Sequence, residues 1–112
     1  MENDFWEYLE RLIEESTIVV DRPKGTAHPQ FPEMIYPLDY GYFQDTTSMD
    51  GGGIDIWVGT QTKKNLDAII CTIDLNKKDI EIKLLIGCSE VNQKTIIDFH
   101  NSDAMRAFLI RR

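Results

Sequence analysis

The stretch from Tyr36 to Asp55 reads YPLDYGY over 36–42 and closes with DGGGID over 50–55. Asp50 and Asp55 therefore flank three consecutive glycines. Hard divalent cations such as Mg²⁺ take oxygen ligands, and a glycine turn lets two carboxylates converge on one ion. Because tyrosines lie just upstream, the stretch predicts a metal site beside a polar pocket with aromatic walls.

A glycine-rich hairpin with two solvated aspartates is the competing interpretation, because such loops are common. The aspartate pair alone favours that interpretation. Taken together with the tyrosine segment, the pair favours a metal site, since acidic residues beside a pocket often mark function. We therefore expect Asp50 and Asp55 to bind metal. The hydroxyls of Tyr36 and Tyr40 can hydrogen-bond a phosphate or a metal-bound water.

The two segments together resemble the signature of the soluble, magnesium-dependent inorganic pyrophosphatases. That family carries Tyr-Pro-x-x-Tyr-Gly-Phe/Tyr and then Asp-Gly-Asp-Pro-x-Asp, with the same spacing between first and last aspartate as here. A fainter likeness extends from about Val19 to Gly87. The resemblance implies metal-dependent hydrolysis of inorganic pyrophosphate to phosphate by a metal-activated water, with Mg²⁺ or Mn²⁺ as cofactor. It also implies an OB-like five-stranded β-barrel with helices outside it.

A second pair of site residues follows from the resemblance at Glu81-Ile82-Lys83. Alternation along a strand puts Glu81 and Lys83 on one face. They match the family's Asp-x-Lys pair, which implies that Glu81 binds metal and that Lys83 binds phosphate and takes part in catalysis, with Tyr40 orienting the water or a metal ligand. An ion pair on a half-exposed strand is equally favoured. Asp74 or Asp79 is a candidate for a further metal aspartate.

The segment Asp21-Arg22-Pro23-Lys24-Gly25 is similar to the family's Glu-x-Pro-Lys-Gly. One register makes Asp21 a metal ligand, and another makes Arg22 the phosphate-binding arginine. Both registers leave Arg22 and Lys24 as cations near the loop, and a phosphate-rich substrate requires such donors. An exposed basic turn is the alternative.

The chain departs from the family at Gly52, which stands where the family has the aspartate that accepts a proton from the attacking water. A missing general base typically costs about 10²–10⁴-fold in rate. Asp21 and Asp39 are the candidate substitutes. Two further hypotheses follow: a weakly active or non-catalytic module that binds metal and phosphate, and a hydrolase of another phosphoanhydride.

Composition limits the other classes of function. With 112 residues, 42% hydrophobic and 28% charged, the chain fits a single globular domain over residues 1–112. A net charge of −7 argues against nucleic-acid binding. No apolar run approaches membrane-spanning length, and the N-terminus lacks a signal-peptide pattern, so we expect a cytoplasmic protein with no membrane partner. Cys71 and Cys88 are expected to be reduced.

The periodicity of apolar residues predicts a mainly β (α+β) fold. An amphipathic helix is expected over Asp4–Glu15, either as a contact in a homo-oligomer or, as we favour, as a cover for the core. Four prolines interrupt the segment 23–37. The other expected elements are strands at 17–20, 42–43, 54–58, 68–75 and 80–86, a hairpin turn at 76–79, a helix from Ser89 to His100, and a strand or short helix over Ala104–Ile110.

Overall fold

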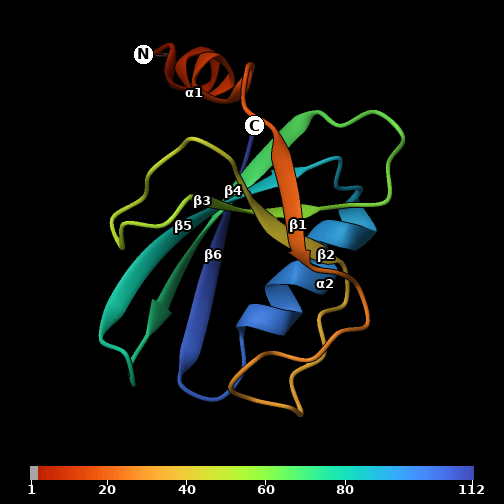
Figure 1. The fold of residues 1–112 in the computed structure, drawn as a ribbon, viewed down its shortest axis with the longest axis vertical. Coiled ribbons are helices and arrows are strands. Elements are labelled where there is room, and N and C mark those ends of the chain that lie inside the picture. The colour runs from red at the N-terminus through yellow and green to blue at the C-terminus, as the bar shows by residue number, and fades with distance from the viewer. Residues whose placement is uncertain (1–2) are drawn as a thin grey trace.

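The computed structural model describes residues 3–112, which form one six-stranded sheet and two helices (Figure 1). No helix in this range has the length and apolar character needed to cross a membrane. In chain order the elements are α1 (Phe5–Ile13), β1 (Ile18–Arg22), β2 (Asp39–Phe43), β3 (Ile54–Val58), β4 (Leu66–Asp74), β5 (Asp79–Ile86), α2 (Glu90–His100) and β6 (Met105–Arg111).

The sheet is open and has six strands, which corrects the prediction of an OB-like five-stranded β-barrel. Its strand order is β1-β2-β3-β5-β4-β6, with β1 and β6 at opposite edges. The sixth strand is the C-terminal tail, which pairs antiparallel with the whole of β4 from Ala68 to Asp74. Because β6 takes the free side of β4, β6 becomes the edge of the sheet. It does not pair with β1 at the other edge, so the sheet does not close into a barrel. The class, mainly β with two helices, is as expected.

One pair of neighbouring strands is parallel: β3 runs alongside β5, with Ile56 opposite Leu84 and Val58 opposite Ile86. All the other neighbours are antiparallel. Parallel neighbours cannot be joined by a tight turn. The crossover here is made by β4. After β3 the chain skips one position in the sheet to form β4, and β5 then returns antiparallel to fill the position between β3 and β4. This arrangement carries Glu81 and Lys83 of β5 toward Asp55 of β3.

Both helices begin close to where the sequence predicts. Ser89 is the N-cap of α2: its Oγ accepts a hydrogen bond from the Asn92 backbone N–H at 3.1 Å, and the Asn92 side chain accepts one from the Ser89 N–H at 3.1 Å. This reciprocal capping satisfies two backbone donors that the first turn leaves without partners. Helix α1 is shorter than the expected Asp4–Glu15.

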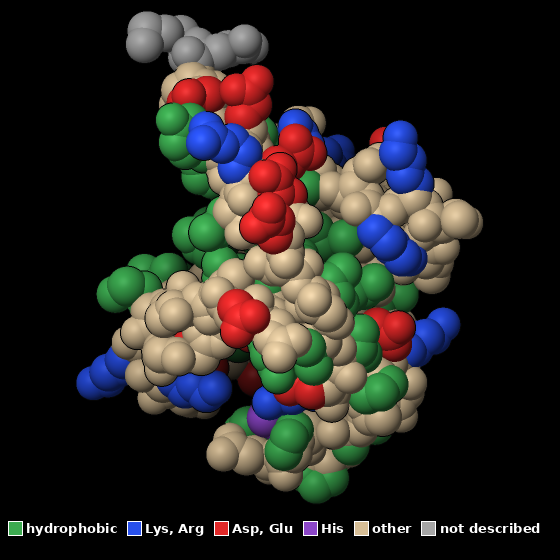
Figure 2. All heavy atoms as spheres, turned by 45° about the horizontal axis from the view of Figure 1, so that its top comes forward, with side chains coloured by type: hydrophobic (Ala, Val, Ile, Leu, Met, Phe, Trp, Pro, Cys, Tyr) green, Lys and Arg blue, Asp and Glu red, His purple; other side chains and the backbone are tan. Residues whose placement is uncertain are grey.

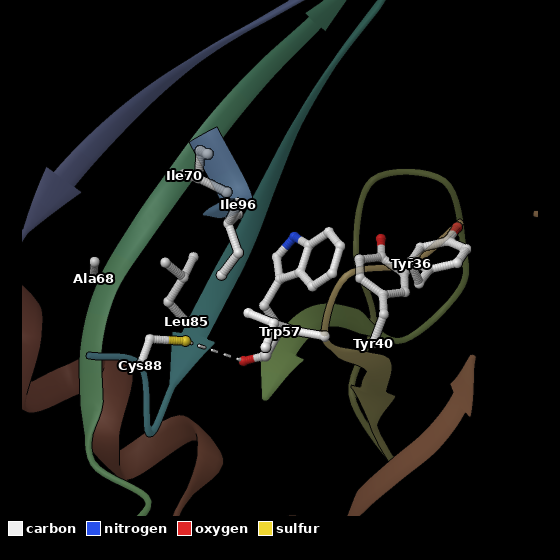
Figure 3. Packing of buried hydrophobic residues seen from close by; sticks show 9 residues of the cluster. Tyr36, Tyr40, Trp57, Ala68, Ile70, Leu85, Cys88 and Ile96 are labelled. Atoms are coloured by element: carbon white, nitrogen blue, oxygen red, sulfur yellow. Dashed lines mark hydrogen bonds between the residues drawn. The ribbon is translucent and has the colours of Figure 1, made fainter. Parts of the chain in front are cut away.

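Hydrophobic side chains pack on both faces of the sheet. On one face Ile96 of α2 lies over Ile70 and Leu85, and the rings of Tyr36, Tyr40 and Trp57 lie beside one another (Figure 3). On the other face Trp6, Leu9 and Ile13 of α1 pack against a second buried cluster, whose members are Phe43, Ile56, Leu66, Ile69, Leu84 and Ile86. The structure thus agrees with the interpretation of α1 as a cover for the core.

The tyrosine segment depends on a close approach between β1 and β2. A Cβ atom on Gly41 would lie 1.8 Å from the backbone oxygen of Val19. Only glycine fits there. On the other side of β2, pairing with β3 places Tyr40 opposite Trp57, with their ring centroids 4.8 Å apart. The proline-rich segment before β2 is irregular, as predicted, apart from an isolated bridge between Ala27 and Ile35.

Candidate active site

A cavity of about 370 Å³ gathers most of the predicted site residues on the α2 side of the sheet. Five carboxylates and three cationic side chains share its wall with aromatic rings, and Figure 2 shows charged side chains of both signs beside a histidine low on one face. Its charged members are Asp50, Asp55, Asp74, Asp79, Glu81, Arg22, Lys77 and Lys83, and its aromatic members are His28, Tyr36, Tyr40, Phe99 and His100.

Lys83 is the centre of this site. Its ammonium donates to the Tyr40 hydroxyl at 2.7 Å, to Glu81 Oε2 at 2.8 Å and to Asp55 Oδ2 at 3.2 Å. An ammonium has three donors, so these three partners satisfy all of them. The side chain of Lys83 is only 6% exposed, whereas those of Asp55 and Glu81 are 30% and 29% exposed. The carboxylates therefore reach water while the ammonium does not.

The titration of this cluster follows from its burial and its charges. Burial alone lowers the pKa of Lys83, but Tyr40, Asp55 and Glu81 outweigh it and raise that pKa. Burial raises the pKa of Tyr40, which Lys83 opposes only in part. The ammonium stays charged and the phenol stays neutral throughout the physiological pH range. The cavity thus holds a fixed cation beside a fixed hydroxyl.

Replacing Lys83 by Met is expected to lower the free energy of unfolding by about 2–4 kcal/mol. The variant leaves Asp55 and Glu81 facing each other without a counter-ion, and their partial exposure reduces the cost below that of a fully buried pair. Urea unfolding of Lys83→Met and of Lys94→Met provides the comparison, because Lys94 makes an exposed ion pair with Asp98 on α2. Equal losses in the two variants would contradict the central role of Lys83.

The glycine loop holds Asp50 at the cavity edge. Asp50 Oδ1 accepts hydrogen bonds from Ser48 Oγ at 2.7 Å and from the Gly52 N–H at 2.9 Å. These two bonds, that from Ser48 first, lower the pKa of Asp50 and keep it ionised. Gly51 takes the positive φ of 86° that the turn requires. The backbone of Gly52 therefore has no need of glycine.

The end of β1 and the loop after it place the residues of the two registers differently. Arg22 lines the cavity and donates to the Tyr36 hydroxyl, whereas Asp21 is exposed and is not part of the cavity wall. Lys24 also lies outside that wall, and its backbone N–H donates to Asp39 Oδ1 at 2.8 Å. Asp39 thus stabilises the loop. Arg22 is therefore the residue of this segment that lines the cavity.

Four further residues line the cavity, and two of them, Asp74 and Asp79, are the candidates for a further metal aspartate. Asp74 accepts hydrogen bonds from two backbone N–H groups of the following turn, at 2.9 and 3.1 Å. The other two, His28 and Lys77, carry no recognisable signal in the sequence. His28 stacks on Tyr36 with ring centroids 6.2 Å apart, and Lys77 lies in the turn between β4 and β5. Spacing along the chain does not indicate His28 and Lys77, so only the tertiary structure places them at the cavity.

His100 is the last residue of α2, a position where a cation would suit the helix dipole. It is buried, and the Trp57 Nε1–H donates to its Nε2 at 2.9 Å. Burial, followed by the charge of Lys83, lowers the pKa of His100 to about 3, so the ring is neutral. Contact with Trp57 and Phe99 outweighs the attraction of a cation to the helix end.

The buried neutral ring of His100 predicts acid sensitivity. An unfolded histidine has a pKa near 6.5, so below that pH the unfolded chain binds a proton that the folded chain excludes. Stability is therefore lost as pH falls from about 6.5 toward 3, by up to about 1.4 kcal/mol per pH unit. Urea unfolding at several pH values should show a steeper loss for the parent than for His100→Gln, which keeps an acceptor for Trp57. Parallel slopes would contradict a neutral His100.

The donor set suits a hard cation in its chemistry. Asp50, Asp55 and Glu81 offer carboxylate oxygens to one cavity, and Mg²⁺ prefers such ligands. Within residues 3–112, however, no group of three or more His, Cys, Asp or Glu side chains is arranged to hold a metal ion. The ammonium of Lys83 forms ion pairs with both Asp55 and Glu81. A metal would compete with Lys83 for these two carboxylates.

This open sheet, with its charged cavity beside the glycine loop, is similar to the fold of the inorganic pyrophosphatases. One solved inorganic pyrophosphatase, from Helicobacter pylori, matches with a TM-score of 0.58 and 14% identity, covering 86% of this chain and 82% of that one. Another, from Coxiella burnetii, matches with a TM-score of 0.55 and 16% identity over the same shares. No protein-family model and no curated protein matches the sequence. The likeness is one of fold.

Proposed function

We propose that this protein is a metal-dependent phosphoanhydride hydrolase that acts on inorganic pyrophosphate. The observation that carries the proposal is the single cavity that joins the carboxylates of Asp50, Asp55 and Glu81 to the cations Arg22 and Lys83. Carboxylates suit magnesium, and cations suit phosphate oxygens. A site for a magnesium–pyrophosphate complex requires both. The pyrophosphatase-like fold supports the same assignment.

Each residue has a defined task under this proposal. Asp50, Asp55 and Glu81 would hold Mg²⁺ or Mn²⁺, which when bound neutralises phosphate charge and lowers the pKa of a coordinated water. Arg22 presents a guanidinium, the donor best matched to phosphate oxygens. Tyr40 keeps its hydroxyl hydrogen-bonded to Lys83 and so fixes the direction of the ammonium. Asp21 as a metal ligand and Lys24 as a phosphate-binding residue stay predictions, and both lie outside the cavity wall.

Lys83 gives this site a distinctive property. All three of its donors are taken in the ligand-free protein, so a phosphate oxygen can bind Lys83 only by replacing one of its partners. Asp55 makes the longest of the three bonds and is the partner most readily released. Binding of a cation by Asp55 and binding of phosphate by Lys83 thus favour each other, because each removes the other's competitor.

A second candidate function, a binding module with little turnover, rests on Gly52. That position offers no side chain to accept a proton beside Asp50. A panel of phosphate-release assays separates the hypotheses. Pyrophosphate cleaved in preference to nucleoside di- and triphosphates supports the lead function, a reversed preference supports another phosphoanhydride, and tight binding without release supports the module. No binding of any of these compounds in the presence of Mg²⁺ would refute the proposal.

Magnesium is expected to stabilise the protein, and more so together with a pyrophosphate analogue. A ligand that binds only the folded state adds RT ln(1 + [L]/Kd), which is about 2.7 kcal/mol at a hundredfold excess over Kd. Thermal melts with magnesium, with a non-hydrolysable analogue and with both measure this gain. The control is a melt in sodium chloride at the same ionic strength, which separates specific binding of magnesium from a general effect of salt. A melting temperature that does not change with millimolar magnesium, with or without the analogue, would count against the metal site.

A further inference from the structure

Three strands of the sheet present an uncovered hydrophobic face on the side opposite α2. The pairing registers align the side chains in rows: Ile73 beside Ile80, and Ile82 beside Cys71 and Phe108. In the next row, Leu84 and Ile69 belong to the buried cluster under α1, whereas Ile110 beside them is exposed. Within residues 3–112 nothing covers the outer rows. Strand alternation explains why: Glu81 and Lys83 point into the cavity, so their neighbours on β5 point outward.

Helix α1 continues this hydrophobic surface. Its apolar arc is wider than the part that packs on the domain, and no residue of α1 is fully buried. Trp6, Leu9 and Ile13 pack inward, whereas Phe5, Tyr8 and Leu12 stay exposed. An apolar groove of about 660 Å³ joins the exposed stripe to the sheet face, because Phe5, Ile80 and Ile82 all line it. Figure 2 shows hydrophobic side chains directly beside acidic ones at the top of the view.

The size of this surface exceeds what a monomer normally exposes. Eight large side chains on it are 41 to 70% exposed. They are Phe5, Tyr8, Leu12, Ile73, Ile80, Ile82, Phe108 and Ile110. Taking about 150–250 Å² for a large side chain, their exposed area is on the order of 800 Å². Monomers rarely expose apolar patches of more than a few hundred Å², whereas a stable dimer buries about 800 Å² on each partner.

We propose that a second copy of this chain covers this surface, with α1 of each protomer lying on the β5-β4-β6 face of the other. A twofold interface needs one self-complementary surface, and the helix stripe and the sheet face supply its two halves. Their charges also match: α1 carries the exposed Glu7, while the sheet face ends at Arg106, opposite Ile73. An anionic membrane is a poor alternative occupant because the chain carries a net charge of −7.

The oligomeric state of the full chain tests this proposal. Sedimentation equilibrium from micromolar to submillimolar protein should give twice the chain mass of 13.0 kDa. The double variant Ile82→Lys/Phe108→Lys should halve that mass. Both side chains are exposed in the single chain, so the substitutions should leave the fold intact, as circular dichroism can verify. The matched control is Val91→Lys on α2, which changes an exposed apolar residue outside the surface and should stay dimeric.

Cys71 provides a second readout, because it lies between Ile82 and Phe108 in the middle row of the face. A maleimide should label Cys71 about tenfold faster in the double variant than in the parent at protein concentrations well above the dimer Kd. Cys88 is buried, so the maleimide should not label it in either the parent or the double variant. A parent that is monomeric throughout the concentration range, or a double variant that keeps the dimer mass and slow labelling, would overturn the proposal. Neither outcome depends on pyrophosphate hydrolysis.

Discussion

Asp55→Asn is expected to reduce magnesium-dependent pyrophosphate hydrolysis to background while leaving the fold intact. Asp55 lies on β3, where the parallel pairing with β5 brings it within 3.2 Å of Lys83. Asparagine keeps the size of the side chain but removes the charge that would attract a divalent cation. The remaining bonds from Lys83 to Tyr40 and Glu81 preserve the local packing, so the stability cost should be only about 1 kcal/mol.

The control for this variant is Asp98→Asn, since Asp98 is a carboxylate on α2 whose side chain is 66% exposed and lies in a surface ion pair. Steady-state phosphate release, magnesium titration by calorimetry and circular dichroism complete the comparison. Parent-like hydrolysis in Asp55→Asn would show that the assignment of this carboxylate is wrong. Loss of hydrolysis in both variants would indicate a general effect of charge on the protein.

Gly52→Asp is expected to raise the hydrolysis rate by up to about 10²–10⁴-fold, the usual contribution of a placed general base. The substitution is structurally feasible because the positive φ of the turn lies at Gly51. A Cβ atom on Gly52 would lie 3.3 Å from Asp50 Oδ1, a tight contact with a side-chain atom that a small rotation relieves. The new carboxylate would enter the site beside Asp50, as the motif of the resembled family requires.

Gly52→Asn is the matched control, since it has the same shape but cannot accept a proton at neutral pH. Single-turnover hydrolysis and magnesium affinity are measured for the parent and both variants. A gain in Gly52→Asp alone identifies a site that lacks only its base. Unchanged rates in a folded Gly52→Asp variant that binds magnesium would mean that another group already acts as base, or that the cavity is a binding site without turnover.

Local features of this chain were predictable because they depend on residues that are close in sequence. The pattern at Ser89 to His100 predicts helix α2 and its cap, and alternation predicts that Glu81 and Lys83 share a face. The β-branched run near Ile18 predicts β1. Hydrogen bonding and side-chain period determine these features within a few residues, so they do not depend on contacts with distant parts of the chain.

The path of the C-terminal tail was not predictable, nor was the state of His100. The periodicity of Ala104–Ile110 is compatible with both a strand and a short helix. In the structure this segment forms strand β6 because it pairs with β4. His100 is the last residue of a helix, where a cation would suit the helix dipole, yet its burial beside Trp57 lowers its pKa and keeps the ring neutral. In both cases the deciding partner lies more than 30 residues away in the chain, where spacing carries no information.

The groups that this protein can offer to a ligand are readable in the amino-acid order: a glycine loop with Asp50 and Asp55, and a strand with an alternating acid and lysine. The contacts of Lys83 with Asp55 and Glu81 depend on the packing of distant segments, and so does the position of Arg22, rather than Asp21, in the cavity wall. The physical reason is the range of each interaction. Side-chain chemistry and local period belong to single segments, whereas burial, ion pairing and the parallel β3–β5 contact arise only when distant segments pack together.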